Sequence, residues 1–399
     1  MKTFTKYFTL VMALVAVLSC SEKEQPAGGL GVDMQGAVLG FDKNVIKADG
    51  NDQVTFTAYF NGSNVDGQAN IYTKGTTGKF DTKIGRTFSA EKEGEYEFIL
   101  QYKTNKSEVV KISAISRDIP SAVSDPQPSN TSFVHRTFFN QYTGANCGFC
   151  PFMTHLLDQT LVDGYEDKVV LAEIRNYDST EASFANIPNS SGGYPYLMID
   201  YSKSFDHNSG SNEAAKILQG LVDEWVAVPA KVGISAHPVY YEDGQIIVKV
   251  SVKAAQTGEY NVGLWLMQDE VQIPQKFGND TPGALDGTWD SGYKGDSSKN
   301  RYDYHHNAVR VASSKYMGAH VGFPLGTIEA GKTADWIFVV NVKLTGDDIT
   351  YGWWEEFGSK VNLDDLHFAA FVTSRSGARY VVENAIDFKY NETRAFEYK

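Results

Sequence analysis

Two cysteines separated by two residues are the strongest chemical signal in this sequence. Cys147 and Cys150 lie in the stretch Cys-Gly-Phe-Cys-Pro. An apolar strand-like run precedes the pair. Apolar residues at helical spacing follow it, which predicts that Cys147 opens an amphipathic helix with a buried face of Phe152, Met153, Leu156, Leu157 and Leu161. A sulfur at a helix N-terminus faces unpaired backbone N–H groups, which favour its thiolate. We therefore expect Cys147 to be the exposed attacking thiol and Cys150, one turn in, to be the buried resolving thiol.

A metal site is the alternative use of such a pair. Zinc prefers four ligands, and among the histidines only His155 is close in sequence, where we expect it on a solvated helix face. His305 and His306 follow Asp303, but adjacent residues of a strand point to opposite faces, so their imidazoles should diverge. The acidic loop 279–300 contains four aspartates whose spacing fits no known calcium loop. We therefore predict no metal and no other cofactor.

The third cysteine, Cys20, ends an N-terminal targeting segment. Residues 1–19 contain two lysines and an apolar run that is too short to span a bilayer. The run ends in Val-Leu-Ser-Cys, which resembles the bacterial lipobox, where the cysteine receives acyl chains such as palmitate before cleavage; the alternative is an ordinary signal peptide with a chance cysteine. We expect residues 1–19 to be removed and residues 20–36 to form a lipidated tether. The protein would then be anchored in the outer membrane, on its periplasmic or its surface-exposed face.

Charge and cysteine usage exclude two classes of protein. The net charge is −13, and removal of Lys2 and Lys6 with the leader makes it more negative, which argues against binding to nucleic acid. With Cys20 lipidated, both remaining cysteines lie in one tetrapeptide. No disulfide can then join distant segments, so the chain is not a disulfide-stapled scaffold.

The hydrophobic period divides the rest of the sequence into segments. Hydrophobic residues at 42%, aromatic residues at 13% and short alternating apolar runs favour β-rich structure. Residues 37–116 alternate between turn signals, and residues 94–98 (Gly-Glu-Tyr-Glu-Phe) resemble the tyrosine corner of immunoglobulin-like domains. Residues 117–132 are a Pro-rich linker, residues 133–229 alternate strand and helix, and residues 230–399 return to strand patterns. We expect a multidomain α/β plus all-β protein with an N-terminal Ig-like β-sandwich, a central α/β domain and a C-terminal β-sandwich.

A second motif follows the cysteines at a distance of 45 residues. The stretch Gly-Tyr-Pro-Tyr around Pro195 directly precedes a predicted strand. It resembles the thioredoxin superfamily, in which a cis-proline at the start of this strand lies against the C-x-x-C pair. The resemblance implies a cis peptide bond at Pro195 and a neighbouring backbone segment with which an extended substrate can pair. It also implies that the central domain, residues 133–229, is thioredoxin-like.

Further motifs resemble one family within that superfamily. Residues 142–151 (YTGANCGFCP), 193–195 (GYP) and 304–310 (YHHNAVR), with a closing hairpin at 368–385, are similar to those of the outer membrane protein twenty-eight related family. Members of this family are thioredoxin-like surface lipoproteins of Bacteroidetes. The resemblance covers residues 133–399 and leaves the Ig-like segment outside. It implies a fold and a compartment more than an activity.

Two positions depart from the superfamily pattern. Asn146 stands before the first cysteine, where tryptophan is usual, and Gln141 stands six residues before it, where an acidic residue commonly accepts the proton of the resolving thiol. A neutral amide cannot accept that proton. Glu173 on the next predicted strand is a candidate substitute, although a glutamate on a strand is more often solvated. We therefore expect slow turnover.

Two functions stay open on the sequence alone. In the first, Cys147 attacks a substrate disulfide, a mixed disulfide forms beside Pro195, and Cys150 resolves it, so that the partners are protein thiols and disulfides. In the second, the cysteines form a local structural disulfide and the protein is a non-catalytic surface or periplasmic binding protein. The fold alone does not choose between them.

Overall fold

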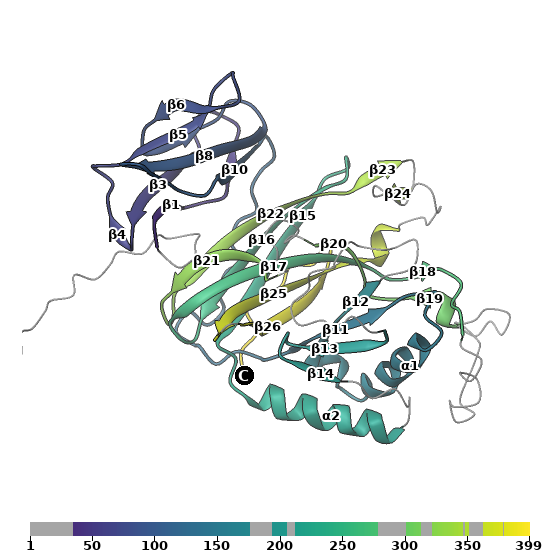
Figure 1. The fold of residues 1–399 in the computed structure, drawn as a ribbon. Coiled ribbons are helices and arrows are strands. Elements are labelled where there is room, and N and C mark those ends of the chain that lie inside the picture. The colour runs from purple at the N-terminus through teal and green to yellow at the C-terminus, as the bar shows by residue number, and fades with distance from the viewer. Residues whose placement is uncertain are drawn as a thin grey trace, which may run out of the picture.

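Strands dominate this protein, which is known here from a computed structural model. The structure describes residues 35–175, 194–205, 212–277, 301–312, 321–345, 348–350, 362–377 and 379–399. As predicted, the chain is a multidomain, β-rich protein with several sheets. The two α-helices within the described ranges lie together beside one sheet (Figure 1). Neither is long and apolar enough to cross a membrane.

The N-terminal unit consists of two packed sheets (Figure 1). The first sheet contains β1 (Ala37–Phe41), β3 (Gln53–Phe60), β4 (Ser63–Asn64) and β7 (Thr87–Ser89). The second contains β2 (Val45–Lys47), β5 (Asn70–Lys74), β6 (Phe80–Ile84), β8 (Gly94–Tyr102), β9 (Asn105–Lys106) and β10 (Val110–Ile115). Phe56 and Phe98 meet in the core with ring centroids 4.8 Å apart. The Tyr96 hydroxyl donates to the Lys92 carbonyl at 2.9 Å, which is the hydrogen bond of a tyrosine corner.

Residues 117–132 contain no helix or strand but are bound to the C-terminal part of the chain. The ammonium group of Lys253, whose side chain is 2% exposed, donates to the carboxylate of Asp125 and to the carbonyl of Pro128, each at 2.8 Å. The Tyr398 hydroxyl donates to the same carboxylate at 2.7 Å. Hydrogen bonds to one buried cation therefore hold this segment in place.

The described residues of the central segment form four strands and two α-helices. β11 (Thr137–Thr143) runs parallel to β12 (Val169–Arg175) and antiparallel to β13 (Tyr196–Ile199), which pairs with β14 (Lys203–Phe205). α1 (Cys150–Thr160) and α2 (Asn212–Ala227) lie on one side of these strands, and η1 (Glu166–Lys168) precedes β12 (Figure 1). Phe139 of β11, Leu156 of α1 and Leu218 of α2 share one buried cluster, as the apolar spacing of both helices predicts. This packing fixes α1 against β11.

The C-terminal part extends the same sheet. β20 (Ala308–Ala312) pairs with β12 through Glu173 and Ala308, and the sheet continues through β17 (Gly258–Gln268), β25 (Leu366–Ser376) and β26 (Arg379–Lys389), with β21 (Phe323–Ile328) also on β17. A separate three-stranded sheet contains β15 (Val232–Tyr240), β16 (Gln245–Ala254) and β22 (Thr333–Asn341). The short remaining elements are β18 (Val271–Gln272), η2 (Arg301–Asp303), β19 (Tyr304–His305), β23 (Lys343–Thr345), β24 (Asp348–Thr350) and η4 (Leu363–Asp365). The central and C-terminal segments thus share one nine-stranded sheet across residues 229 and 230.

The N-terminal unit contacts β22 through backbone-like hydrogen bonds. The side-chain amide of Asn44 donates to the carbonyl of Ile337 at 2.7 Å and accepts from its N–H at 3.2 Å. Phe41 packs beside Trp336 with ring centroids 6.0 Å apart. Buried apolar residues of the N-terminal unit and of the C-terminal sheets consequently belong to one continuous cluster.

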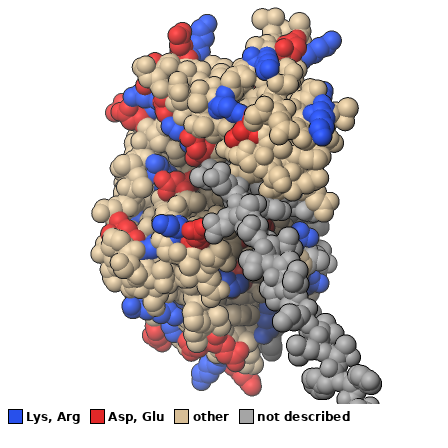
Figure 2. All heavy atoms as spheres, turned by 90° about the vertical axis from the view of Figure 1, so that its left-hand side faces the viewer, with Lys and Arg blue, Asp and Glu red and all other residues tan. Residues whose placement is uncertain are grey.

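Charged side chains of both signs are interspersed over the face shown in Figure 2. Acidic and basic groups lie near one another there, and neither sign forms a large area. The negative net charge of the chain is therefore not gathered into one acidic patch on this face.

Candidate redox site

Cys147 and Cys150 form a disulfide between β11 and α1. The prediction that Cys147 opens the helix is wrong, because its N–H donates to the Gly144 carbonyl at 3.0 Å in a turn and α1 begins at Cys150. Pro151 occupies the first helical turn, where its missing N–H costs nothing. Cys150 is 1% exposed, whereas Cys147 is only half-buried. The pair therefore has an outer and an inner sulfur, in the order predicted.

The second predicted site residue, Pro195, lies at the same end of the sheet. The Tyr194–Pro195 peptide bond is cis, as the motif implied. Tyr196 pairs with Tyr142 near the end of β11, with ring centroids 5.4 Å apart. The chain continues from β11 into the turn that carries Cys147, so the proline and the disulfide are presented by neighbouring strands.

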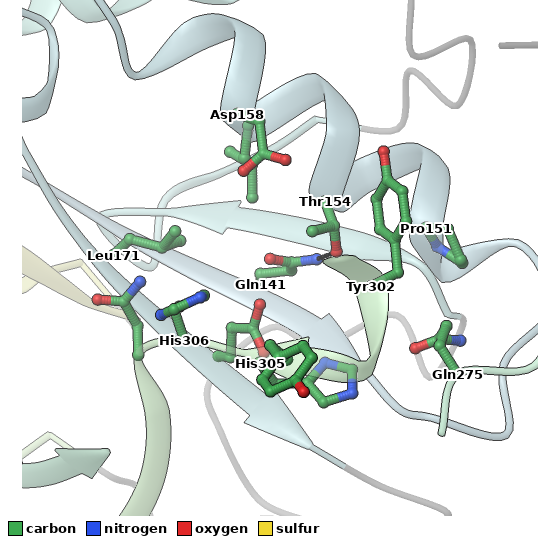
Figure 3. Close-up of a pocket in the computed structure, with 13 residues that line it drawn as sticks. Gln141, Pro151, Thr154, Asp158, Leu171, Gln275, Tyr302, His305 and His306 are labelled. Carbon is green, nitrogen blue, oxygen red and sulfur yellow. Dashed lines mark hydrogen bonds between the residues drawn. The ribbon is translucent and has the colours of Figure 1, made fainter. Parts of the chain in front are cut away.

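A small cavity of about 60 Å³ lies between α1 and the sheet (Figure 3). Gln141 enters it from β11, and its Nε2 donates to Oγ1 of Thr154 on α1 at 3.0 Å. The Oε1 atom of Gln141 is buried and has no hydrogen-bond partner among the described residues. The lining is otherwise mixed, with Pro151, Leu157, Asp158, Leu171, Glu173, Gln275, Tyr302, Tyr304, His305, His306 and Asn307. Such a cavity suits ordered water, which needs polar partners on its walls.

Glu173 provides a buried carboxylate beside Gln141. The two residues are register partners on the parallel strands β12 and β11, and both line the cavity. The expectation of a solvated Glu173 is wrong, because the residue is 4% exposed and its carboxylate pairs with the fully buried guanidinium of Arg175 at 3.0 Å. A charge at this depth persists only with such a partner.

The C-terminal part of the chain covers one side of α1. His155, expected on a solvated face, is 2% exposed because its Nδ1 is 3.1 Å from the Tyr302 hydroxyl. Arg301 forms an ion pair with Asp158 one turn later on the helix. Burial raises the pKa of Tyr302 to about 12, so its hydroxyl stays protonated near neutral pH.

Gln275 is a site residue that sequence reasoning missed. Its Nε2 donates to the carbonyls of Ala145 at 3.1 Å and of Cys147 at 3.0 Å. The N–H of Lys276 donates to the Ala145 carbonyl at 2.8 Å. No local pattern marks Gln275, since its partners lie about 130 residues earlier in the chain.

The histidine pair does not form a metal site with the described residues. The Nε2 of His305 is 3.1 Å from the Ile273 carbonyl, whereas the Nδ1 of His306 is 3.7 Å from Asp269. The carboxylate of Asp303 accepts from the N–H of Gln275 at 2.8 Å. In the ranges that the structure describes, no group of three or more His, Cys, Asp or Glu residues could hold a metal.

A buried ion network lies behind His306. Burial alone would lower the pKa of His367, but hydrogen bonds and charge from Asp269, at 3.5 Å, and Asp387, at 2.7 Å, raise it to about 9. Burial alone would raise the pKa of Asp269, but the nearby imidazoles of His306, at 3.7 Å, and His367, at 3.5 Å, hold it well below its usual range. His367 is therefore a protonated, paired imidazole at neutral pH.

Two predicted features lie outside the described residues, namely Cys20 and the whole acidic loop 279–300. The prediction of a lipid anchor on Cys20 therefore stays a prediction, as does the absence of a calcium site in the loop.

Comparison with known proteins adds a distant structural neighbour. No protein-family model matches the chain, and no curated protein matches it. Among solved structures, HBP35 of Porphyromonas gingivalis is similar over 67% of this chain and 78% of its own, with 14% identity and a TM-score of 0.47. A likeness at this level assigns neither a family nor an activity.

Proposed function

We propose that this protein is an exported, thioredoxin-like thiol–disulfide exchange protein, tethered to the outer membrane through a lipid on Cys20. The observation that carries the proposal is the disulfide itself, with Cys147 half-buried and Cys150 1% exposed as the first residue of α1. Cys147, the attacking thiol, lies in the turn directly before α1, where the positive end of the helix dipole favours a thiolate. The cis bond before Pro195, on the neighbouring strand, supports the same assignment.

The exchange transfers two electrons and needs no bound cofactor. In the reducing direction, the Cys147 thiolate attacks a substrate disulfide, forms a mixed disulfide and releases one substrate thiolate. The Cys150 thiolate then attacks the Cys147 sulfur, closes the Cys147–Cys150 disulfide and releases the second substrate thiolate. The substrate is reduced by two electrons and the protein is oxidised by two; the oxidising direction is the reverse.

Polypeptides with accessible cysteines are the substrates that the surroundings of the disulfide favour. Phe149, between the two cysteines, is 56% exposed and presents an apolar ring beside the outer sulfur. Exposed aromatic side chains supply contact area for apolar segments of a partner.

The second candidate is a binding protein in which the disulfide is only structural. Gln141 favours it, because an amide stands where exchange would profit from a proton acceptor.

Trapping of mixed disulfides distinguishes the two functions. After reduction, Cys150→Ser should accumulate mixed disulfides through Cys147, whereas the matched Cys147→Ser variant should accumulate far fewer, because its remaining sulfur is buried. At mildly acidic pH, a limiting alkylating reagent should label Cys147 before Cys150. If both thiols are alkylated equally slowly and no mixed disulfide is trapped, exchange is ruled out and the protein functions as a binding protein.

A further inference from the structure

The turn that carries Cys147 is held by a segment from the C-terminal part of the chain. Gln275 donates from its side-chain amide to the carbonyls of Ala145 at 3.1 Å and Cys147 at 3.0 Å. The N–H of Lys276 donates to Ala145 at 2.8 Å. Figure 3 shows Gln275 on a loop below Pro151, apart from Gln141 and Thr154. The same Nε2 also lies 2.9 Å from the Lys276 carbonyl and 3.5 Å from the Gly144 carbonyl, so its two hydrogens are shared among these acceptors. A side-chain amide and a backbone N–H thus join residues 275 and 276 to the redox turn.

The carbonyl that Gln275 binds belongs to the ring closed by the disulfide. The backbone path from Cys147 to Cys150 contains this carbonyl, and the same oxygen accepts the N–H of Cys150 at 3.3 Å. Fixing it restricts the backbone between the two cysteines, whose Cα atoms are 5.4 Å apart. Gln275 therefore acts on the distance and orientation of the two sulfurs without touching either of them.

The support for Gln275 does not depend on the redox turn. Its own N–H donates to the Asp303 carboxylate at 2.8 Å, and the N–H of Ile273 donates to the Asp303 carbonyl at 2.8 Å. Beside them, Val271 of β18 pairs with His305 of β19. These contacts are made within the C-terminal part of the chain, so they hold the Gln275 amide in position even when the cysteines are reduced.

We propose that Gln275 is a positioning residue that sets the balance between the disulfide and dithiol forms of Cys147 and Cys150. This inference rests on the proposed exchange function. Reduction by two glutathione molecules converts the disulfide to two thiols and yields one glutathione disulfide, so the turn loses its cross-link and gains conformational freedom. Hydrogen bonds to Ala145 and Cys147 limit that gain, because they restrain the turn in both forms. Gln275 therefore favours the oxidised pair.

The equilibrium constant with glutathione tests this role. Gln275→Ala keeps the backbone bonds of residues 275 and 276 but removes the side-chain donors. The equilibrium should shift toward the dithiol by about fivefold to tenfold, as expected when the backbone of about one residue gains freedom in the dithiol form. Tenfold corresponds to roughly 30 mV in reduction potential. Gln275→Glu should shift it further in the same direction, because a carboxylate cannot donate and is repelled by both carbonyl oxygens.

Gln219→Ala is the matched control. Gln219 of α2 donates from the same atom type to the carbonyl of Thr160 at 3.0 Å, at the other end of α1. This variant loses an equivalent hydrogen bond to the same helix, and its equilibrium constant should equal that of the wild type. An unchanged constant in Gln275→Ala, or an equal shift in Gln219→Ala, would overturn the inference.

Failure of the proposed function has a different signature. A wild-type pair that equilibrates with glutathione but never reduces or oxidises a protein disulfide in a turnover assay would contradict exchange as the function. The comparison between Gln275→Ala and Gln219→Ala would remain readable in that protein, because a structural disulfide also has an equilibrium constant.

Discussion

Replacing Gln141 by glutamate should place a proton acceptor beneath the inner thiol. The amide of residue 141 is 3.0 Å from Thr154, which is one helical turn beyond Cys150 on the same face, where side chains are about 5–6 Å apart. A carboxylate there would lie within about one side-chain spacing of the Cys150 thiol, a distance that one bridging water can span. Because Cys150 is 1% exposed, its thiolate is disfavoured, and a general base typically contributes about 10²–10⁴-fold. We expect Gln141→Glu to accelerate resolution of a mixed disulfide on Cys147 by about 100-fold at pH 7, the lower end of that range.

The same substitution should make stability depend on pH. Burial and the neighbouring carboxylate of Glu173 both raise the pKa of the introduced carboxyl above the value of about 4.3 that it has in the unfolded chain. A carboxyl with a raised folded pKa stays neutral in the folded state until the pH reaches that pKa. Below about pH 4 it is neutral in the unfolded chain too, so Gln141→Glu loses no stability on this account there. The loss grows as pH rises from there to the folded pKa. A shift of two units would cost about 2.7 kcal/mol of unfolding free energy above that pKa.

An aromatic disulfide that releases a coloured thiolate measures the resolution rate. Mixing it with reduced protein releases one thiolate when Cys147 attacks and a second when Cys150 resolves, and the second phase is the one expected to accelerate in Gln141→Glu. Gln219→Glu puts the same charge on α2 and should leave that phase unchanged. A second phase as slow in folded Gln141→Glu as in the wild type would show that residue 141 does not take the proton of Cys150.

Three further predictions concern other parts of the chain. Lys253→Met should lower the unfolding free energy by about 2–4 kcal/mol, because it removes the buried donor from several acceptors. Limited proteolysis should then cut within residues 117–132 sooner than in the wild type; equal rates would contradict the anchoring role. Since the folded pKa of His367 is about 9, its contribution to stability is present below about pH 6.5 and lost as pH rises through 9. In His367→Gln, the unfolding free energy measured with urea should change less with pH between about 6.5 and 9. An unchanged pH dependence would show that other groups cause it. Cys20→Ser should move the protein from membranes to the soluble fraction, and retention in membranes would exclude the lipid anchor.

Strand positions were predictable wherever alternate residues are buried on one face. Along β16, the alternate residues Ile246, Val248, Val250 and Val252 are fully buried in one core cluster, as the period of two in the sequence predicts. The intervening Ile247, Ser251 and Lys253 are buried as well, which that period does not predict. The sheet shared by the central and C-terminal segments was not predictable. It depends on the pairing of Glu173 with Ala308, and no local preference specifies which distant strand lies beside β12.

The candidate site shows the same division. Cys147, Cys150 and Pro195 are recognisable because short motifs and their spacing carry the signal. The role of Gln275 and the burial of His155 could not be predicted, because both depend on contacts between residues more than 120 positions apart. A side chain that acts by binding a backbone carbonyl leaves no motif, since any sequence offers carbonyls.

The contact between Asn44 and Ile337 protects an edge strand of this protein from pairing with another molecule of the same chain. Among the described residues, β22 pairs with β16 on one side only, and its other side would present free backbone groups to a strand from another molecule. The primary amide of Asn44 imitates a peptide group and occupies the donor and acceptor of Ile337. A fragment that lacks residues 35–116 would leave this strand open, and we expect it to self-associate side by side through β22 into sedimentable oligomers.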